Sequence, residues 1–154
     1  MKTREEEVED FIRSYFKKFD RGRVNPVLKL LSSEGIVVFG KERFSGKRSI
    51  KGFYTEFFER VTNGDHKLRN LRVETSGFEA IAICDWTFTA HIIKIGKACK
   101  MEGRCRFRLL YEDDRWMITE LGIYPNLMKT LIRHGLINFI KLGRAKDQFR
   151  FAKI

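Results

Sequence analysis

The sequence contains no long hydrophobic run. Charged and polar residues interrupt every apolar stretch well short of the ~20 apolar residues that a membrane-spanning helix needs. Residues 1–7 are mostly charged, which is not the pattern of a signal peptide. These absences argue against helical membrane spans, and we expect a cytoplasmic protein.

Cysteine and histidine are scarce, with three residues of each. The cysteines are odd in number and show no Cys-x-x-Cys spacing, so we expect buried, reduced thiols rather than a disulfide framework at Cys84, Cys99 and Cys105. The histidines fall in no HxH or HExxH pattern: they are His66, His91 and His134. The sequence therefore predicts no metal site and no cofactor.

Positive charge is in excess and is unevenly distributed. The formal net charge is +11, of which residues 126–154 carry +6 and the first 125 residues carry +5. A basic surface attracts nucleic acid or anionic lipid without any base-specific contact. Non-specific nucleic-acid binding through this basic tail, or binding to an anionic membrane surface, is therefore one alternative function.

The hydrophobic pattern predicts a single α+β domain over residues 1–125, and 43% apolar residues are enough to build a core. Apolar residues recur at helical spacing in three segments, which predicts three helices. The first follows a capping box of Thr3 and Glu6, the second follows Asn25-Pro26, and the third ends near Gly64. A short strand is predicted at 36–39. From residue 66 the apolar residues recur at every second position, which predicts strands at 66–75, 78–93, 100–111 and 115–124. Four consecutive strands with short connections indicate an antiparallel sheet, with the three helices on one face.

A basic amphipathic extension follows at 126–154. Its first part, residues 126–142, has apolar residues at helical spacing and basic residues between them, which predicts an added C-terminal helix. Such a helix could close a pocket, pack on a second subunit, or lie on an anionic membrane surface.

Four segments carry a resemblance to a known superfamily. They are the Ser45–Ile50 turn into a helix, the Ala80–Trp86 strand, the Gly103–Tyr111 strand and the Arg115–Ile118 strand. In order and spacing they resemble the nuclear transport factor 2-like superfamily, which includes SnoaL-like polyketide cyclases and ketosteroid isomerases, over residues 5–125. The resemblance implies a cone-shaped, cystatin-like α+β barrel: a curved sheet wrapped around the three N-terminal helices. This fold hosts enzymes, carriers and assembly domains.

The resemblance also implies a pocket. Ketosteroid isomerases use a tyrosine and two carboxyl groups around an apolar site; by spacing, the tyrosine is Tyr15, and the carboxyl positions fall on Phe39 and Phe107. Phenylalanine cannot abstract a proton, so we predict no catalytic residue by this mechanism. We expect instead a ligand pocket with Tyr15 as its main polar group, lined by Tyr15, Phe39, Tyr54, Trp86, Phe88 and Phe107.

In the predicted strand 78–93 the even positions from 78 to 90 are all apolar, whereas the odd positions include the polar residues Glu79, Asp85, Thr87, Thr89 and His91. We expect Trp86 and Phe88 to face the helices and Asp85 to face outward, paired with Arg106 or Arg108 of the next strand. A bulge in the strand would reverse this and bring Asp85 and His91 into the pocket. That alternative predicts a lyase, isomerase or cyclase that acts on a small hydrophobic substrate.

The main functional hypothesis is therefore a small-molecule-binding or assembly module with an apolar pocket. We also expect a homodimer formed through the outer face of the sheet, because Ile81 and Ile83 point outward there and would leave an apolar patch.

Overall fold

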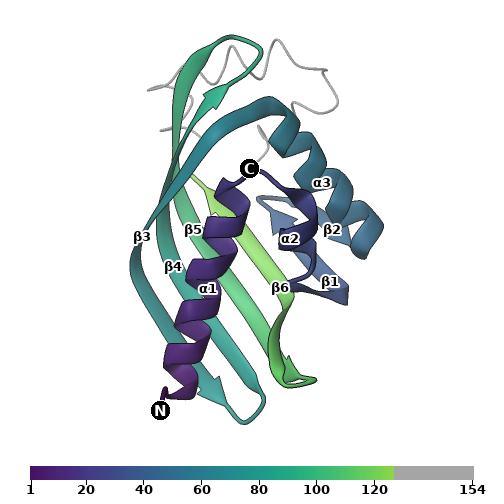
Figure 1. Cartoon of the computed structure of the whole chain (residues 1–154), viewed down its shortest axis with the longest axis vertical. Coiled ribbons are helices and arrows are strands. Elements are labelled where there is room, and N and C mark those ends of the chain that lie inside the picture. The colour runs from purple at the N-terminus through teal and green to yellow at the C-terminus, as the bar shows by residue number, and fades with distance from the viewer. Residues whose placement is uncertain (127–154) are drawn as a thin grey trace.

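The computed structural model describes residues 1–126, and the predicted C-terminal helix and the rest of the extension lie outside the described residues. Three helices and one six-stranded curved sheet make up this part of the chain (Figure 1). The helices are α1 (Arg4–Asp20), α2 (Val24–Leu28) and α3 (Lys47–Arg60). The strands are β1 (Leu31–Phe39), β2 (Glu42–Ser45), β3 (Val61–Ser76), β4 (Glu79–Ile92), β5 (Lys97–Glu112) and β6 (Arg115–Pro125). The predicted α+β class is confirmed.

The sheet is mixed, so the expectation of a purely antiparallel sheet is wrong. Its strand order is β2-β1-β6-β5-β4-β3, and β1 pairs with β6 in parallel. Helix α3 carries the chain from the edge strand β2 to the opposite edge strand β3. The meander from β3 to β6 then returns across the sheet and brings β6 alongside β1 in the same direction.

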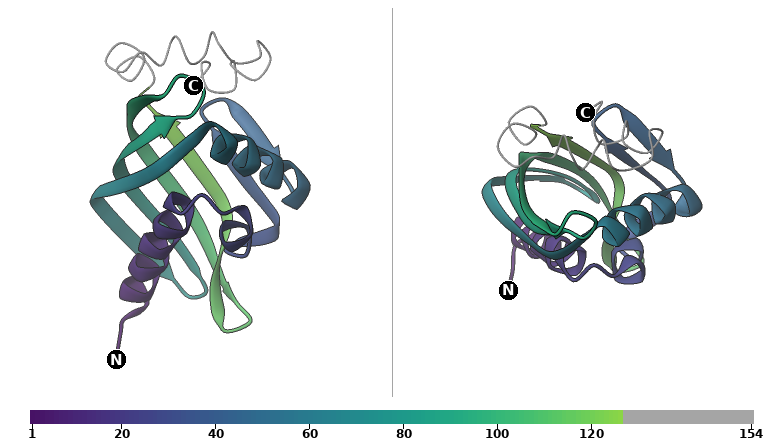
Figure 2. Two further views of the ribbon diagram at one scale, coloured as in Figure 1. Left: turned by 45° about the horizontal axis from the view of Figure 1, so that its top comes forward. Right: turned by 90° about the horizontal axis from the view of Figure 1, so that it is seen from above.

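Two irregularities in β3 accompany its curvature. The register with β4 shifts between Thr62 and Asp65 and again between Arg69 and Arg72. Asn63 and Asn70 have positive φ angles of 55° there, a conformation that asparagine tolerates better than most residues. Because a bulge increases local twist, these sites help the sheet to curl, and helix α1 packs against β3 and β4 (Figure 2).

Helix α1 forms as the sequence predicts. Thr3 and Glu6 make the reciprocal capping box, and the apolar stripe is buried at Val8, Ile12, Tyr15, Phe16 and Phe19. The chain leaves the helix through Gly22, whose φ of 69° is readily adopted only without a Cβ. The helix therefore presents three aromatic rings to the interior.

Several element boundaries differ from the prediction because tertiary pairing extends the strands. Strand β1 begins at Leu31 rather than at 36, since Leu31 already pairs with Ile118 of β6. Helix α3 ends at Arg60, not near Gly64, because the backbone from Val61 onward pairs with β4. Strand β2 was not expected at all.

Helix α2 also begins earlier than predicted. Its cap is Arg23, which makes no side-chain capping bond, and not Asn25. Pro26 is still tolerated, because an N–H group in the first turn of a helix has no intrahelical partner.

The three cysteines are free and buried, as the sequence predicts. Burial raises the pKa of the Cys99 thiol to about 11 and that of Cys84 to about 12, and it raises the pKa of Cys105 well above its usual value. A raised pKa lowers the thiolate fraction, and only the thiolate is a good nucleophile.

We therefore expect the thiols of the folded protein not to react with Ellman's reagent within minutes at pH 8. After guanidinium denaturation all three thiols of the chain should react at once. Immediate reaction of one thiol in the folded protein would contradict the burial of that side chain.

Within the described residues, no helix is long and apolar enough to cross a membrane.

Candidate active site

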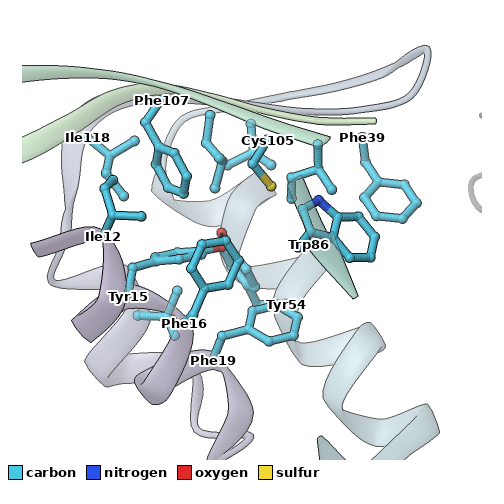
Figure 3. Packing of buried hydrophobic residues seen from close by; sticks show 14 of the residues in the cluster. Ile12, Tyr15, Phe16, Phe19, Phe39, Tyr54, Trp86, Cys105, Phe107 and Ile118 are labelled. Atoms are coloured by element: carbon cyan, nitrogen blue, oxygen red, sulfur yellow. Dashed lines mark hydrogen bonds between the residues drawn. The ribbon is translucent and has the colours of Figure 1, made fainter. Parts of the chain in front are cut away.

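An aromatic cluster fills the space between the helices and the sheet (Figure 3). It encloses a cavity of about 30 Å³, lined by Tyr15, Phe16, Phe19, Phe39, Phe53, Phe57, His66, Trp86, Phe88, Met101, Cys105 and Ile123. This volume corresponds to about one water molecule, whereas small-molecule sites usually measure ~300–1,000 Å³. A ligand larger than water must therefore displace wall side chains, among which Met101 is the most flexible.

The six residues predicted to line a pocket are all buried in this cluster. Tyr15, Phe39, Trp86 and Phe88 line the cavity itself. Tyr54 and Phe107 lie directly behind Tyr15: the Tyr54 hydroxyl is 2.7 Å from the Tyr15 hydroxyl, and the Phe107 ring meets the Tyr15 ring edge-on. The structure thus brings the predicted set together in one core, and ligand binding by it stays a prediction.

The two tyrosine hydroxyls form a buried pair near the centre of the cluster (Figure 3). Burial raises the pKa of Tyr15 well above its usual value and also raises that of Tyr54. Both side chains therefore stay neutral at physiological pH. They can donate and accept hydrogen bonds, but neither has a pKa suited to removing a proton from carbon.

The cavity wall contains one titratable group that the sequence analysis did not single out. His66 lies on β3, and its side chain is 7% exposed. Its Nδ1 atom is 2.5 Å from Oδ1 of Asp20, the last residue of α1, and its backbone N–H donates to Oδ2 of Asp20 at 2.7 Å. We refer to these two residues as the Asp20–His66 pair.

The surroundings of the His66 ring are aromatic. Its centroid lies 4.5 Å from that of Phe88, 4.7 Å from Phe16 and 5.2 Å from Phe19.

The position of Asp20 costs the helix some stability. A carboxylate at the last residue of a helix meets the negative end of the helix dipole. Two N–H donors from His66 offset this unfavourable position. Such an arrangement fixes the imidazole orientation rather than stabilising the helix.

The contact with Asp20 also determines the histidine tautomer. An ionised carboxylate only accepts hydrogen bonds, so Nδ1 carries the proton that is donated to Asp20. This leaves Nε2 with a free lone pair. In this tautomer the histidine is a base oriented by a carboxylate, the arrangement that general-base catalysis uses.

Asp85 and His91 do not face the cavity, so the alternative in which a bulge turns these two residues inward is wrong. Strand β4 keeps its register with β5 throughout, so both residues stay on the outer face. Asp85 accepts a hydrogen bond from Arg104 at 2.9 Å and another from Asn70, and both bonds lower the pKa of its carboxyl group. His91 is exposed.

The partner of Asp85 is Arg104 rather than the predicted Arg106 or Arg108. Arg104 lies directly opposite Asp85 in the sheet, whereas Arg106 is opposite Ile83 and Arg108 is opposite Ile81. The outward orientation of Asp85, and the inward orientation of Trp86 and Phe88, are confirmed.

A metal centre finds no support in the part of the chain that the structure describes. No group of three or more His, Cys, Asp or Glu side chains gathers there in a way that could hold an ion.

The sequence did contain a signal for His66. It is two residues from Leu68, so both side chains share the face of β3 that turns toward the helices. The signal for Asp20 was weaker, since an acidic residue after the apolar stripe of a helix is usually solvated.

Comparison with known proteins assigns the fold to the nuclear transport factor 2-like superfamily, as the sequence predicted. The chain belongs to the SnoaL-like domain family, whose model matches residues 3–122. No curated protein sequence matches the chain.

Three solved structures illustrate the range of similar proteins. A candidate scytalone dehydratase from Novosphingobium aromaticivorans is 12% identical, with a TM-score of 0.73 over 79% of this chain and 83% of that chain. A ketosteroid isomerase-like protein from Erwinia carotovora atroseptica is 17% identical, with a TM-score of 0.72 over 82% and 98%. A hexachlorocyclohexane dehydrochlorinase, LinA type 2, is 12% identical, with a TM-score of 0.70 over 79% and 84%. At these identities the likeness establishes the fold alone.

Proposed function

We propose that this protein is an enzyme that removes a proton from carbon in a small, uncharged, hydrophobic substrate, with His66 as the general base. The observation that carries the proposal is the Asp20–His66 pair in the cavity wall. The reaction class is lyase or isomerase. This differs from the main sequence-based hypothesis of a binding module, because the proposed base is His66 and not a residue at position 39, 107, 85 or 91.

The chemistry follows from the geometry of the pair. The substrate C–H bond breaks, and its proton moves to the lone pair of His66 Nε2. The electron pair left on carbon moves into an adjacent unsaturated group, or it forms a C=C bond while a leaving group departs from the neighbouring carbon. Asp20 stabilises the imidazolium through the bond to Nδ1 and prevents rotation of the ring.

The lining restricts the substrate. Among the described residues that line the cavity, His66 is the single histidine, and none is Lys, Arg, Asp or Glu. Burial of a charged substrate without a counter-ion would be costly, so the substrate is neutral. Two similar structures are named a dehydratase and a dehydrochlorinase, and both names describe eliminations that break a C–H bond.

The experiment is deuterium exchange in D₂O. Small carbon acids such as cyclohexanone and nitrocyclohexane are incubated with the full chain, and loss of the acidic C–H signal is followed by proton NMR. We expect exchange faster than an equal concentration of free imidazole produces. If no compound of the panel exchanged faster than that, the pair would be structural and the binding-module hypothesis would be favoured.

We also propose that the protein forms a homodimer through the outer face of β3–β6. Ile81 is half-buried and Ile83 is 37% exposed on this face, between charged residues of both signs on the adjacent strands. Sedimentation velocity at tens of micromolar protein should give a dimer, and Ile83→Lys should shift it toward monomer. A strict monomer for the parent chain would refute this assembly.

A further inference from the structure

The turn between β4 and β5 presents an apolar side chain to solvent. It comprises residues 93–96 and lies at the end of the molecule opposite the N-terminus (Figure 1). Ile93 is 54% exposed there, whereas Ile95 is half-buried and packs against the core. A single exposed isoleucine is common on protein surfaces, so its meaning depends on what surrounds it.

The backbone fixes the position of this turn. The N–H of Ile93 donates to the carbonyl oxygen of Arg60, the last residue of α3, at 2.9 Å. The N–H of Gly96 donates to the carbonyl oxygen of Ile92, also at 2.9 Å, and Gly96 has a φ angle of 62° that favours glycine. The exposed position of Ile93 is therefore set by the fold.

The charge around the turn is positive. Residues 91–100 contain three lysines and no aspartate or glutamate. Lys94 and Lys97, on either side of Ile95 in the sequence, are both exposed. The first acid further along β5 is Glu102, which already forms an ion pair with Lys100 at 3.8 Å. An exposed apolar side chain thus lies between cationic side chains.

Two other segments bring positive charge to the same end of the sheet. Lys41 is exposed in the turn between β1 and β2, where the N–H of Gly40 donates to the carbonyl oxygen of Ile123 at 2.8 Å. Strand β6 ends beside the start of β5, since the N–H of Asn126 donates to the carbonyl oxygen of Glu102 at 2.6 Å. The chain leaves the sheet at this point, and the residues from 126 onward carry a net charge of +6.

We infer that this end of the sheet docks on the surface of a lipid bilayer that contains anionic phospholipid, with Ile93 inserted among the headgroups. Durable attachment to a bilayer generally takes two signals, an apolar insertion and electrostatic attraction. The β4–β5 turn supplies the first, and the lysines and the basic extension supply the second. The inference is independent of the proposed function.

Other partners fit this surface less well. A second copy of the chain would bring like charges together, and one turn is far smaller than the ~800 Å² per partner of a stable protein interface. Single-stranded nucleic acid stacks its bases on aromatic rings, whereas the exposed side chain here is aliphatic. A bilayer surface matches both features, because its anionic headgroups attract lysine and its acyl region accepts isoleucine.

The test is co-sedimentation of the full chain with vesicles of phosphatidylcholine alone or of phosphatidylcholine mixed with phosphatidylserine. The turn variants are Ile93→Asp and Lys97→Gln. Their matched controls lie in turns at the other end of the sheet. Phe78→Asp changes a side chain that is 63% exposed between β3 and β4, and Arg115→Gln changes the first residue of β6, as Lys97 is the first residue of β5. Circular dichroism should show that all four variants are folded.

We expect the parent to bind the mixed vesicles and to bind phosphatidylcholine far more weakly. Ile93→Asp should weaken binding to the mixed vesicles about tenfold, because it removes the apolar insertion and adds a negative charge. Lys97→Gln should weaken it about fivefold, which is the usual contribution of one lysine near an anionic surface. Both controls should stay within about twofold of the parent, since charges more than a Debye length from the bilayer are screened.

Insertion of the turn is measured separately. Ile93→Trp places an indole at the exposed position, whereas the native Trp86 and Trp116 are 3% and 6% exposed. Mixed vesicles with brominated acyl chains should therefore quench the introduced indole and leave the fluorescence of the parent nearly unchanged.

Three results would overturn the inference. They are parent-like affinity of Ile93→Asp for the mixed vesicles, equal losses in the turn variants and the controls, and an introduced indole that the brominated lipid does not quench. Binding of a single-stranded oligonucleotide without binding to the mixed vesicles would also overturn it, in favour of a nucleic-acid partner.

Discussion

Replacement of Asp20 by asparagine, or of His66 by glutamine, is expected to lower the rate of carbon deprotonation by at least ~10²-fold, which is the usual contribution of a positioned general base. His66→Gln removes the base itself. Asp20→Asn keeps the size of the side chain but removes the charge that stabilises the imidazolium, and its amide can orient the ring in the wrong tautomer.

The measurement is the deuterium-exchange rate of cyclohexanone in D₂O at constant protein concentration. Asp85→Asn and His91→Gln are matched controls, because they make the same chemical changes on the outer face of β4. Both controls should keep the parent rate. Circular dichroism should show that all four variants are folded.

Equal losses of activity in the controls and in the Asp20–His66 variants would contradict the assignment of the pair.

Replacement of Phe39 by aspartate is expected to destabilise the fold by several kcal/mol, on the order of the cost of burying an unpaired charge. Phe39 is 4% exposed and packs against Phe53, with ring centroids 5.4 Å apart. The substitution removes these contacts and leaves a carboxyl group in an apolar wall.

The destabilisation should depend on pH in a predictable direction. Burial raises the pKa of the new carboxyl group in the folded state above its unfolded value of about 3.9. The folded state then binds more protons, so the free energy of unfolding falls as pH rises from about 4 toward the folded-state pKa. The penalty should be smallest below pH ~4 and should reach its full size at neutral pH.

Thermal melts of parent and variant at pH 4 and pH 7 provide the measurement. Phe78→Asp is a suitable control, since Phe78 is 63% exposed and its substitution should change the melting temperature far less. If Phe39→Asp melted like the parent at pH 7, Phe39 would have to be exposed, and the cavity wall described above would be wrong.

Local patterns predicted the elements well where each residue faces one side of a long, regular segment. The stripe of α1 and the alternation along β4 and β5 are encoded in neighbouring residues, so the buried faces of these elements were correct. The wrong boundaries fall where a strand forms by pairing with a distant segment, as in the first residues of β1 and β3.

The isomerase comparison predicted the core but not its chemistry. It indicated Tyr15, Phe39 and Phe107, which are buried together. Because two of these positions hold phenylalanine where the isomerases have a carboxyl group, the comparison argued against catalysis. The proposed base in the cavity wall is instead His66, whose partner on α1 is 46 positions away in the sequence. No local pattern connects a residue at the end of a helix with one beside a bulge in a strand.

The sequence by itself determined the α+β class, the superfamily, and the apolar lining, because periodicity and residue type act over a few neighbouring positions. Only the tertiary structure decided the parallel pairing of β1 with β6 and the contact between Asp20 and His66. Each of these depends on how segments far apart in the chain meet after the sheet has curved around α1. The physical reason is that hydrogen bonds and cavity walls require positions defined to within an ångström, and packing of the whole core sets those positions.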